Sequence, residues 1–585
     1  MAEEQPVGSI LLADCGTVIT RVVLLEHVAG QYRFVAQGEA LTTTEYPWAD
    51  ISEGIRHAAG QIEEVTGRSF FGAEGDLIVP EAGGRKGVDI FAATASASQP
   101  LELVLGGLVR DLSLASAQRA AAGTYSLVKA SICRDSSESI NDEEIIRIIL
   151  DATPDAVCIA GGTDGGATAP VLELVNTVTL ACSIMDPGVR PQLLYMGNSR
   201  LRRQIVKAVK GQAELRVADN VRPALTVENL VSAQEELDAL YIQKKMGLMP
   251  GIETVNSWCS TPLTPTANAF GRLIHYLWHL GDPARGVLGI DVGAANTTVV
   301  AVFEGRPFIT IHGGIGSAFG GRELLRTRGE EAVARWVPAS MSSEELLGVL
   351  INKEMHPASI YQETRELWVE QAVVREAIRS AVELARPGWR PGNAQPYPHL
   401  MPLCDTIVIA GGAMTHAPRP GHVALMVLDA LEPVGITTLV LDVHGIVPAL
   451  GKVATIAPLA TVEVLDSGAL VNLATVIAPV GEARRGELIL RVNVAYDDGS
   501  NYDVDVHYGD LEVLPLLTNQ EAVVTLRPQR NFDVGLGGPG KSGKRRISGG
   551  LAGLIIDARG RPLRLPRRPE LRHAQIRQWL WDVGG

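Results

Sequence analysis

Cysteine is scarce in this chain, and no two cysteines stand close together. There are six, at widely scattered positions: Cys15, Cys133, Cys158, Cys182, Cys259 and Cys404. Without a CxxC or any paired spacing, the sequence excludes a disulfide framework and disfavours a zinc or iron–sulfur site made from cysteine alone. The pattern is typical of buried thiols in a reducing compartment, so we expect a cytoplasmic protein.

Long apolar runs and a targeting signal are also lacking. Gly, Asp or Pro interrupts each apolar run well short of the roughly 20 residues that a transmembrane helix needs. The opening residues MAEEQPVGS are acidic, whereas a signal peptide begins with a basic region. We therefore expect no membrane partner.

The length and charge of the chain indicate several folded units with an uneven distribution of charge. At 585 residues the chain is too long for one core, and about one domain per 150 residues suggests three or four units. The net charge is −14, yet Lys541 to Arg577 holds eleven basic residues against Asp557 and Glu570. A basic tail on an acidic body predicts an acidic partner, either within the chain or outside it.

Residues 535–542, GLGGPGKS, fit the phosphate-binding pattern G-x-x-x-x-G-K-[ST]. That pattern works only with a buried strand before it and a helix after it, whose N-terminal amides face the phosphates. The preceding LRPQRNFDV contains a proline and two arginines, and three glycines between Gly543 and Gly550 disfavour a helix. We predict a glycine-rich surface loop with a basic rim instead.

One pattern occurs twice in the chain. ILLADCGTVITRVVLLE, from Ile10, and VLGIDVGAANTTVVAVFEG, from Val287, both have an apolar strand, Asp-x-Gly, a small polar turn and a second β-branched strand. Each predicts a hairpin with Asp and Gly at its tip. More than a hundred residues after each hairpin comes an apolar strand ending in Ala-Gly-Gly, AVCIAGGTDGG from Ala156 and TIVIAGGAMTHAP from Thr406. The repeated order predicts a duplicated α/β fold with a cleft between similar halves.

From about Val462 the sequence changes to short runs in which apolar and polar residues alternate, such as GELILRVNVAYDDGSNYDVDVHYG. This alternation predicts a separate, mainly β domain. We therefore expect three domains: residues 1–285 as the first half with helical insertions, residues 286–461 as the second half, and residues 462–585 as a β-rich domain with the basic tail.

A hairpin tip with Asp, Gly and hydroxyl groups suits phosphate and Mg²⁺. Glycine lets backbone amides approach phosphate oxygens, threonine hydroxyls add donors, and the aspartate holds a hydrated metal ion. A single D-x-G-T is typical of an ordinary turn, but two tips in one chain can hold a polyphosphate from both sides.

These motifs resemble those of the actin-like ATPase superfamily, which includes sugar and acetate kinases, actin and the seventy-kilodalton heat-shock chaperones. Over nearly the full length, stretches such as GVDIFAATASASQPLELVLGGLVRDLSLASAQRAA, YMGNSRLR, NVRPALTVENL and GGIGSAFGG resemble the MutL-type protein associated with adenosylcobalamin-dependent glutamate mutase. The resemblance implies actin-like (ribonuclease H-like) halves around a nucleotide cleft, with ATP and Mg²⁺ as cofactors.

The resemblance also assigns site residues. Asp14 and Asp291 are the candidates for catalysis and for holding the metal. The candidates for nucleotide binding that it gives are Gly16, Thr17, Thr20, Gly293, Ala294, Asn296, Thr297, Gly411, Gly412, Ala413 and Met414. Gly161, Gly162 and Asp164, in the first Gly-Gly turn, are further candidates, with an ordinary turn aspartate as the alternative for Asp164. Ala294 and Ala295 stand where chaperones have glycines, so the backbone has less room to approach phosphate. This difference disfavours rapid hydrolysis but not nucleotide binding.

Three functions fit this sequence. The first is an ATP-binding, ATP-hydrolysing chaperone-like accessory protein that acts on a partner enzyme, by resemblance an adenosylcobalamin-dependent mutase, in reactivation or assembly. The second is a kinase for a small carboxylate or sugar, for which no acceptor motif is present. The third is a nucleotide-binding scaffold or filament, a homo-oligomer that hydrolyses nothing. A nucleic-acid partner is disfavoured because the basic tail lacks a stacking or groove-reading motif.

Three further features have simple structural interpretations. Asp503, Asp505 and His507 alternate along a predicted strand and suit either a metal or, as we expect, a solvated strand face. The loop from Asp442 to Gly445 is expected to form a turn, with lining of the nucleotide cleft as the alternative. The final amphipathic segment, with two tryptophans at 579 and 581, is expected to dock onto the body.

Overall fold

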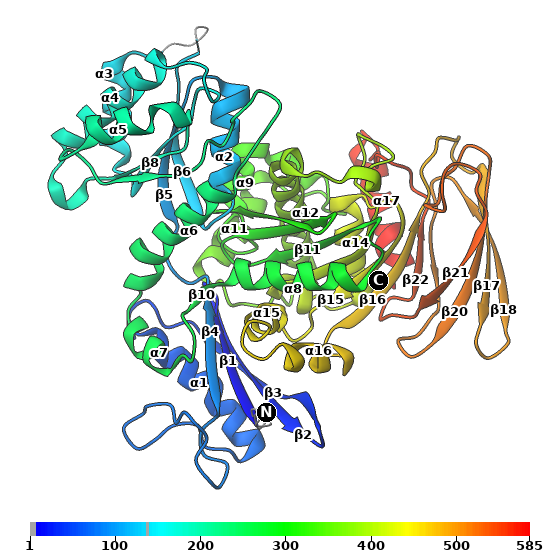
Figure 1. Ribbon diagram of the computed structural model, residues 1–585. Helices are drawn as coiled ribbons and strands as arrows, with labels where there is room; N and C mark the ends of the chain where they lie inside the picture. Colours follow the sequence, from blue (N-terminus) through cyan, green and yellow to red (C-terminus); the bar gives the residue numbers. More distant parts are fainter. Residues whose placement is uncertain (1–7, 136–139, 585) are drawn as a thin grey trace, which may run out of the picture. The chain divides into compact units, whose positions relative to one another are not determined.

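The chain, described here by a computed structural model over residues 8–135 and 140–584, divides into two compact units. The first unit consists of the segment up to Ala95, Glu253–Ile309 and Gly314 onward. The second consists of Ser96–Ile252 with the short segment Thr310–Gly313. In the sequence, the second unit is therefore an insertion into the first, since most of it lies between residues 90–95 and 264–265, two strands of one sheet (Figure 1).

The first sheet is built on the first predicted hairpin. Its strands are β1 (Ser9–Cys15), β2 (Ile19–Val28), β3 (Gln31–Leu41), β4 (Ile90–Ala95) and the short β10 (Thr264–Pro265), in the order β10-β4-β1-β2-β3. The strands β1 to β3 form an antiparallel meander, and β4 pairs with β1 in parallel. Helix α1 (Ile51–Thr66) packs on β3 and β2, and the Asp50 side chain caps it by accepting from Ser52 N.

The second sheet repeats this arrangement and extends it. Its eight strands run in the order β13-β12-β11-β14-β15-β16-β22-β19. Their bounds are β11 (Gly286–Val292), β12 (Thr297–Phe303), β13 (Arg306–His312), β14 (Cys404–Ala410), β15 (Gly435–Leu441), β16 (Val471–Ala478), β19 (Leu511–Leu514) and β22 (Leu554–Asp557). The first five positions, an antiparallel meander followed by parallel strands, match the first sheet strand for strand. The duplicated α/β halves of the actin-like (ribonuclease H-like) arrangement are thus confirmed.

One element of the predicted repeat was wrong. The strand that ends at the first Ala-Gly-Gly is β7 (Ala156–Ile159), and it lies in the inserted unit rather than in the first sheet. The true counterpart of β14 is β4, which pairs with β1 as β14 pairs with β11. Any buried parallel strand that turns sharply into a helix has the same apolar-then-glycine pattern, so the local signal did not distinguish the two sheets.

The inserted unit is an all-parallel sheet with helices. Its strands are β5 (Leu101–Gly107), β6 (Ser126–Cys133), β7, β8 (Gln192–Tyr195) and β9 (Leu215–Val217), in the order β6-β5-β7-β8-β9. Its helices include α2 (Ala115–Ala121), α3 (Asp142–Ala152), α4 (Ala169–Ile184), α5 (Arg202–Val209) and α6 (Val231–Lys244). Its core, which includes Val104, Val157 and Leu193, is separate from the cores of the first unit.

The helices of the first unit cover its sheets. They are α7 (Ile252–Trp258), α8 (Thr266–Leu280), α9 (Gly321–Arg328), α10 (Glu330–Ala334), α11 (Ser343–Met355), α12 (Thr364–Ala385), α13 (Gly412–Thr415), α14 (Pro420–Leu431), α15 (Val447–Val453), α16 (Pro458–Asp466) and α17 (Pro569–Asp582). Helix α15 packs on α8 and β4, which joins the second sheet to the first. One continuous core, including Ile10, Phe270 and Val300, runs between the two halves.

The C-terminal segment is mainly β, as predicted. Strands β17 (Leu488–Tyr496), β18 (Asn501–His507), β20 (Glu521–Pro528) and β21 (Gly543–Ser548) form an antiparallel sheet, drawn in orange in Figure 1. Strands β16, β19 and β22 join the second sheet instead, so that sheet continues across the predicted boundary at residue 461. The division into residues 1–285, 286–461 and 462–585 stays a prediction.

The loop GLGGPGKS joins β20 to β21, two antiparallel neighbours. No helix follows it, which confirms that the strand–loop–helix context of a phosphate-binding loop is missing here. Part of the basic tail finds an acidic partner in the rest of the chain, because the buried guanidinium of Arg559 pairs with Asp429 at 2.8 Å. Helix α17 docks on the body, with Trp579 3% exposed and Trp581 73% exposed.

Within residues 8–135 and 140–584, no helix has the length and apolar character needed to cross a membrane.

Candidate functional site

The two predicted hairpin tips have the same backbone turn. In the first, Gly16 N donates to the carbonyl oxygen of Ile19 at 3.0 Å, and in the second Gly293 N donates to that of Asn296, also at 3.0 Å. The strand register places Asp14 and Asp291 at the same position, one residue before the last pair of each hairpin. The sequence repeat therefore corresponds to a repeated geometry.

Asp14 is held in place by two threonine hydroxyls. Its Oδ1 accepts hydrogen bonds from Thr94 Oγ1 at the end of β4 and from Thr266 Oγ1 at the start of α8, both at 2.7 Å. Burial raises the pKa of Asp14, although these two hydrogen bonds and the charge of Arg21 act to lower it. The carboxylate is thus fixed in position and partly shielded from water.

Asp442 lies after β15 and caps the turn into α15. Its Oδ1 and Oδ2 accept from the backbone N–H groups of Ile446 and Val447, both at 2.9 Å. Burial raises the pKa of Asp442. The predicted turn is confirmed, and the negative charge of Asp442 also acts on Asp291, so the loop contributes to the electrostatics of the site as well.

Asp291 is the least constrained of the three carboxylates. Among the described residues none donates a hydrogen bond to it, unlike Asp14 and Asp442. Burial, followed by the negative charges of Asp14 and Asp442, raises its pKa to about 7. A carboxylate with this pKa is close to half protonated at neutral pH in the metal-free protein, and a nearby cation would favour its ionised form.

Arg21 is a site residue that the motif search missed. It stands directly opposite Asp14 in the β1–β2 register, and its charge acts on Asp14, Asp291 and Asp442. Its Nε donates to Glu39 Oε1 at 2.6 Å, which leaves the guanidinium beside Gly445. At Gly445, where φ is +59°, an added Cβ would lie 1.8 Å from Arg21 Nη1. The available signal was its place in the hairpin, one residue after Thr20.

The second tip presents open backbone donors. The carbonyl oxygen of Ala294 accepts from Ala318 N and Phe319 N, at 3.0 and 2.9 Å, so the GGIGSAFGG loop covers one side of the tip. The N–H groups of Ala294 and Ala295 donate to no acceptor in the described part of the chain. Unsatisfied amides on a half-buried turn are suited to bind an anion.

The glycine pair after β14 lies against the second tip. Gly411 has a φ of +108°, and a Cβ added to it would meet the Val292 carbonyl oxygen at 2.2 Å, so only glycine fits there. Gly412 is exposed and begins α13, whereas Ala413 is half-buried and Met414 is fully buried in the core. Contact of these four residues with a nucleotide stays a prediction.

Two of the predicted threonines use their hydroxyl groups within the protein. Thr20 Oγ1 is 2.9 Å from Thr42 Oγ1, and Thr297 Oγ1 donates to the Ile315 carbonyl oxygen at 2.8 Å. Both side chains are fully buried one residue beyond the tips. Thr17, by contrast, is half-buried on the tip itself.

Gly161, Gly162 and Asp164 lie in the inserted unit, in the loop after β7. Asp164 Oδ1 accepts from Ser199 N and Asn220 Nδ2, both at 2.9 Å. Partial burial acts to raise the pKa of Asp164, but these hydrogen bonds hold it below the usual range. The role of these three residues in nucleotide binding stays a prediction.

The described part of the chain holds no preformed metal cage. Among the described residues no three His, Cys, Asp or Glu side chains are grouped so as to hold a metal ion. Asp503, Asp505 and His507 lie on β18 with their side chains exposed or half-buried, which is the solvated strand face expected from the sequence.

Solved structures of low sequence identity share parts of this architecture. An acetone carboxylase, in its nucleotide-free structure, is 10% identical and covers 86% of this chain and 81% of that chain, with a TM-score of 0.32. Glycerol kinase from Plasmodium falciparum with ADP is 9% identical, covers 78% and 92%, and has a TM-score of 0.30. A glycerol dehydratase reactivase is 11% identical, covers 72% and 94%, and has a TM-score of 0.28. Similarities of this size do not establish a shared function.

Sequence comparison is more decisive. Protein MutL of Clostridium tetanomorphum is 28% identical over 301 residues, which are 51% of this chain and 58% of that protein. The matched region thus spans a little over half of the relative's length. The profile of the family described as MutL protein matches residues 10–468, well over half of the chain and including both hairpin tips. The chain belongs to the MutL protein family.

Proposed function

We propose that this chain binds Mg·ATP between its two hairpin tips and hydrolyses it to act on a partner enzyme, an adenosylcobalamin-dependent mutase. The observation that carries the proposal is the pair of matching turns, each preceded by a half-buried aspartate, with the charges of Asp14 and Asp442 acting on Asp291. The partner rests on membership of the MutL family and on the sequence resemblance to the protein associated with glutamate mutase.

The residues present fit a magnesium ion. Three carboxylates share one positive neighbour, Arg21, and the pKa of Asp291 is raised by the other two, so a divalent cation would relieve their repulsion. Mg²⁺ is usually held by one or two carboxylates together with waters and phosphate oxygens, which agrees with the missing three-residue cage. Asp291 would be the direct or water-mediated ligand, because its oxygens accept no other hydrogen bond from the described residues. The ion would supply charge neutralisation on the phosphates.

The chain's own groups cover the remaining needs of phosphate binding and hydrolysis. The N–H groups of Ala294 and Ala295 offer donors to phosphate oxygens at the second tip, and Thr17 holds the position of Ala294 at the first. Arg21 supplies a positive charge beside them. As a ligand of the ion, Asp291 would orient the attacking water, and the charge of the ion would keep its carboxylate ionised.

The experiment uses the full-length chain with its partner mutase after the mutase has lost activity through damage to its cofactor. Mutase activity should return when the chain, Mg·ATP and fresh adenosylcobalamin are added together, and the Asp291→Asn variant should fail to restore it. Restoration that is equal without nucleotide would contradict the proposal. Transfer of phosphate to a small carboxylate or sugar would favour a kinase instead.

A further inference from the structure

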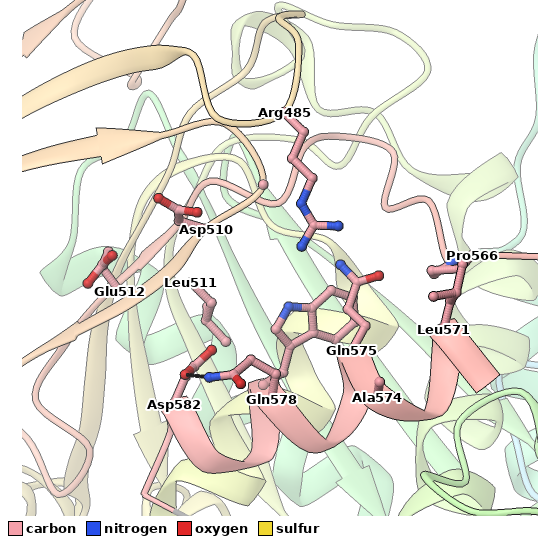
Figure 2. A pocket seen from close by; sticks show the side chains of 12 residues that line it. Arg485, Asp510, Leu511, Glu512, Pro566, Leu571, Ala574, Gln575, Gln578 and Asp582 are labelled. Carbon is pink, nitrogen blue, oxygen red and sulfur yellow. Dashed lines mark hydrogen bonds between the residues drawn. The ribbon is translucent and has the colours of Figure 1, made fainter. Parts of the chain in front are cut away.

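A cavity of about 510 Å³ lies between α17 and the segment that links β18 to β19 (Figure 2). A second cavity of about 350 Å³ shares Arg485, Gly509, Pro566, Gln575 and Trp579 with it. The two therefore form one groove along α17, which we call the α17 groove. The size of the larger cavity falls in the range of sites that bind small molecules.

One end of the α17 groove is acidic. Asp510, Glu512 and Asp582 line it, and within the described part of the chain none of the three has a lysine or arginine within ion-pair distance. Their protein partners are His507, 3.6 Å from Asp510, and Gln578, which donates to Asp582 at 2.7 Å. Burial and the neighbouring carboxylates raise the pKa of both Glu512 and Asp582. This end of the groove therefore holds three carboxylates that pair with no lysine or arginine of the described residues, and His507 is the ion-pair partner of Asp510.

The middle of the α17 groove holds hydrogen-bond donors without acceptors. Trp579 is 3% exposed and its ring lies under the guanidinium of Arg559, 4.4 Å from the ring centre. Its Nε1–H donates to no described residue. Nε1 keeps contact with solvent, and Trp579 lines the groove. The amide of Gln575 and the guanidinium of Arg485 also lack partners among the residues described. These donors line the groove without a protein acceptor, so they are available to an acceptor oxygen of a ligand.

We propose that the α17 groove binds a basic amino-acid unit, with its cationic side chain among Asp510, Glu512 and Asp582 and its carbonyl or carboxylate oxygen at Trp579 and Gln575. The unit has two possible sources, a free amino acid such as arginine or an arginine or lysine residue on a partner chain. Both sources present a cation a few bonds away from an acceptor oxygen, which is the complement of the groove. This inference is independent of the nucleotide site.

The test measures binding to the full-length protein by isothermal titration calorimetry. The probes are L-arginine, N-acetyl-L-arginine amide, agmatine, which lacks the carboxylate, and L-norvaline, which lacks the cation. We expect saturable binding of at least one of the two arginine forms and at least about tenfold weaker binding of norvaline. Tighter binding of the capped form identifies a residue of a partner chain as the source, and tighter binding of free arginine identifies the amino acid. Absence of binding by both arginine forms, or equal binding of norvaline, overturns the proposal.

Two substitutions distinguish the contribution of the acidic end of the groove from that of the donor at Trp579. Glu512→Gln should weaken arginine and agmatine alike by about fivefold, as expected for a lost ion pair that solvent partly screens. Trp579→Phe keeps the ring but removes the N–H, so it should weaken the arginine forms by about fivefold and leave agmatine unchanged. Asp503→Asn on exposed β18 is the matched control, and thermal melting checks that each variant folds. Arginine binding that is unchanged in both Glu512→Gln and Trp579→Phe would refute the assignment.

Discussion

Replacing Asp291 with asparagine should stabilise the nucleotide-free protein above pH 7. In the folded chain the pKa of Asp291 is raised from 3.8 to about 7 by burial and by the charges of Asp14 and Asp442. Between these two pH values the folded state holds a proton that the unfolded state releases, so stability falls as the pH rises through this window. Asparagine does not titrate, and the variant escapes this loss.

The magnitude follows from the size of the shift. A pKa moved from 3.8 to about 7 corresponds to at most about 4 kcal/mol of lost stability at alkaline pH. Asp291 is half-buried, so solvent screening reduces this, and we expect Asp291→Asn to gain about 2 kcal/mol at pH 8 relative to pH 5. Urea unfolding of both proteins at the two pH values measures the difference.

A matched control is Asp505→Asn, whose carboxylate is exposed on β18 and should change stability by less than about 0.5 kcal/mol at either pH. The reasoning is refuted if Asp291→Asn is less stable than the native chain at pH 8. A gain that is the same at pH 5 and pH 8 would also refute it, because it would then arise from packing and not from charge.

Three further substitutions test other parts of the account. Gly411→Ala should cost more than about 2 kcal/mol in urea unfolding, because its φ is +108° and its Cβ would meet the Val292 carbonyl, whereas Gly412→Ala should be nearly neutral. Asp557→Asn should cost about 3 kcal/mol or more, since it removes the charge that pairs with buried Arg561 and leaves buried Arg559 with Asp429 alone, and thermal unfolding would show the loss. Lys541→Ala should leave the affinity for an ATP analogue unchanged in fluorescence titration, and a tenfold loss would restore GLGGPGKS as a nucleotide loop.

The repeated hairpins were predictable because their signal is local. Asp-x-Gly between two β-branched strands specifies a tip whatever surrounds it, and both turns formed as expected at Gly16 and Gly293. The absence of a helix after GLGGPGKS was predictable for the same reason. Local glycine and proline content decided it.

The features that sequence reasoning missed depend on contacts between distant segments. Arg21, which no motif singled out, acts on Asp442 although 421 positions separate them, and the loop at Asp442 was given a place at the cleft only as an alternative to a turn. The assignment of β7 to an inserted sheet depends on which strands pair, which an apolar strand ending in glycines does not specify. Strand β16 likewise joins the second sheet because β15 and β22 offer it free edges, and alternation alone carries no such information.

The most direct test of the account is a crystal structure of the chain with a non-hydrolysable ATP analogue and Mg²⁺. Phosphate oxygens should lie within hydrogen-bond distance of the backbone at Thr17 and at Ala294 or Ala295, with the metal on the Asp291 side. Phosphate bound at Lys541, or an analogue bound away from both hairpin tips, would contradict it.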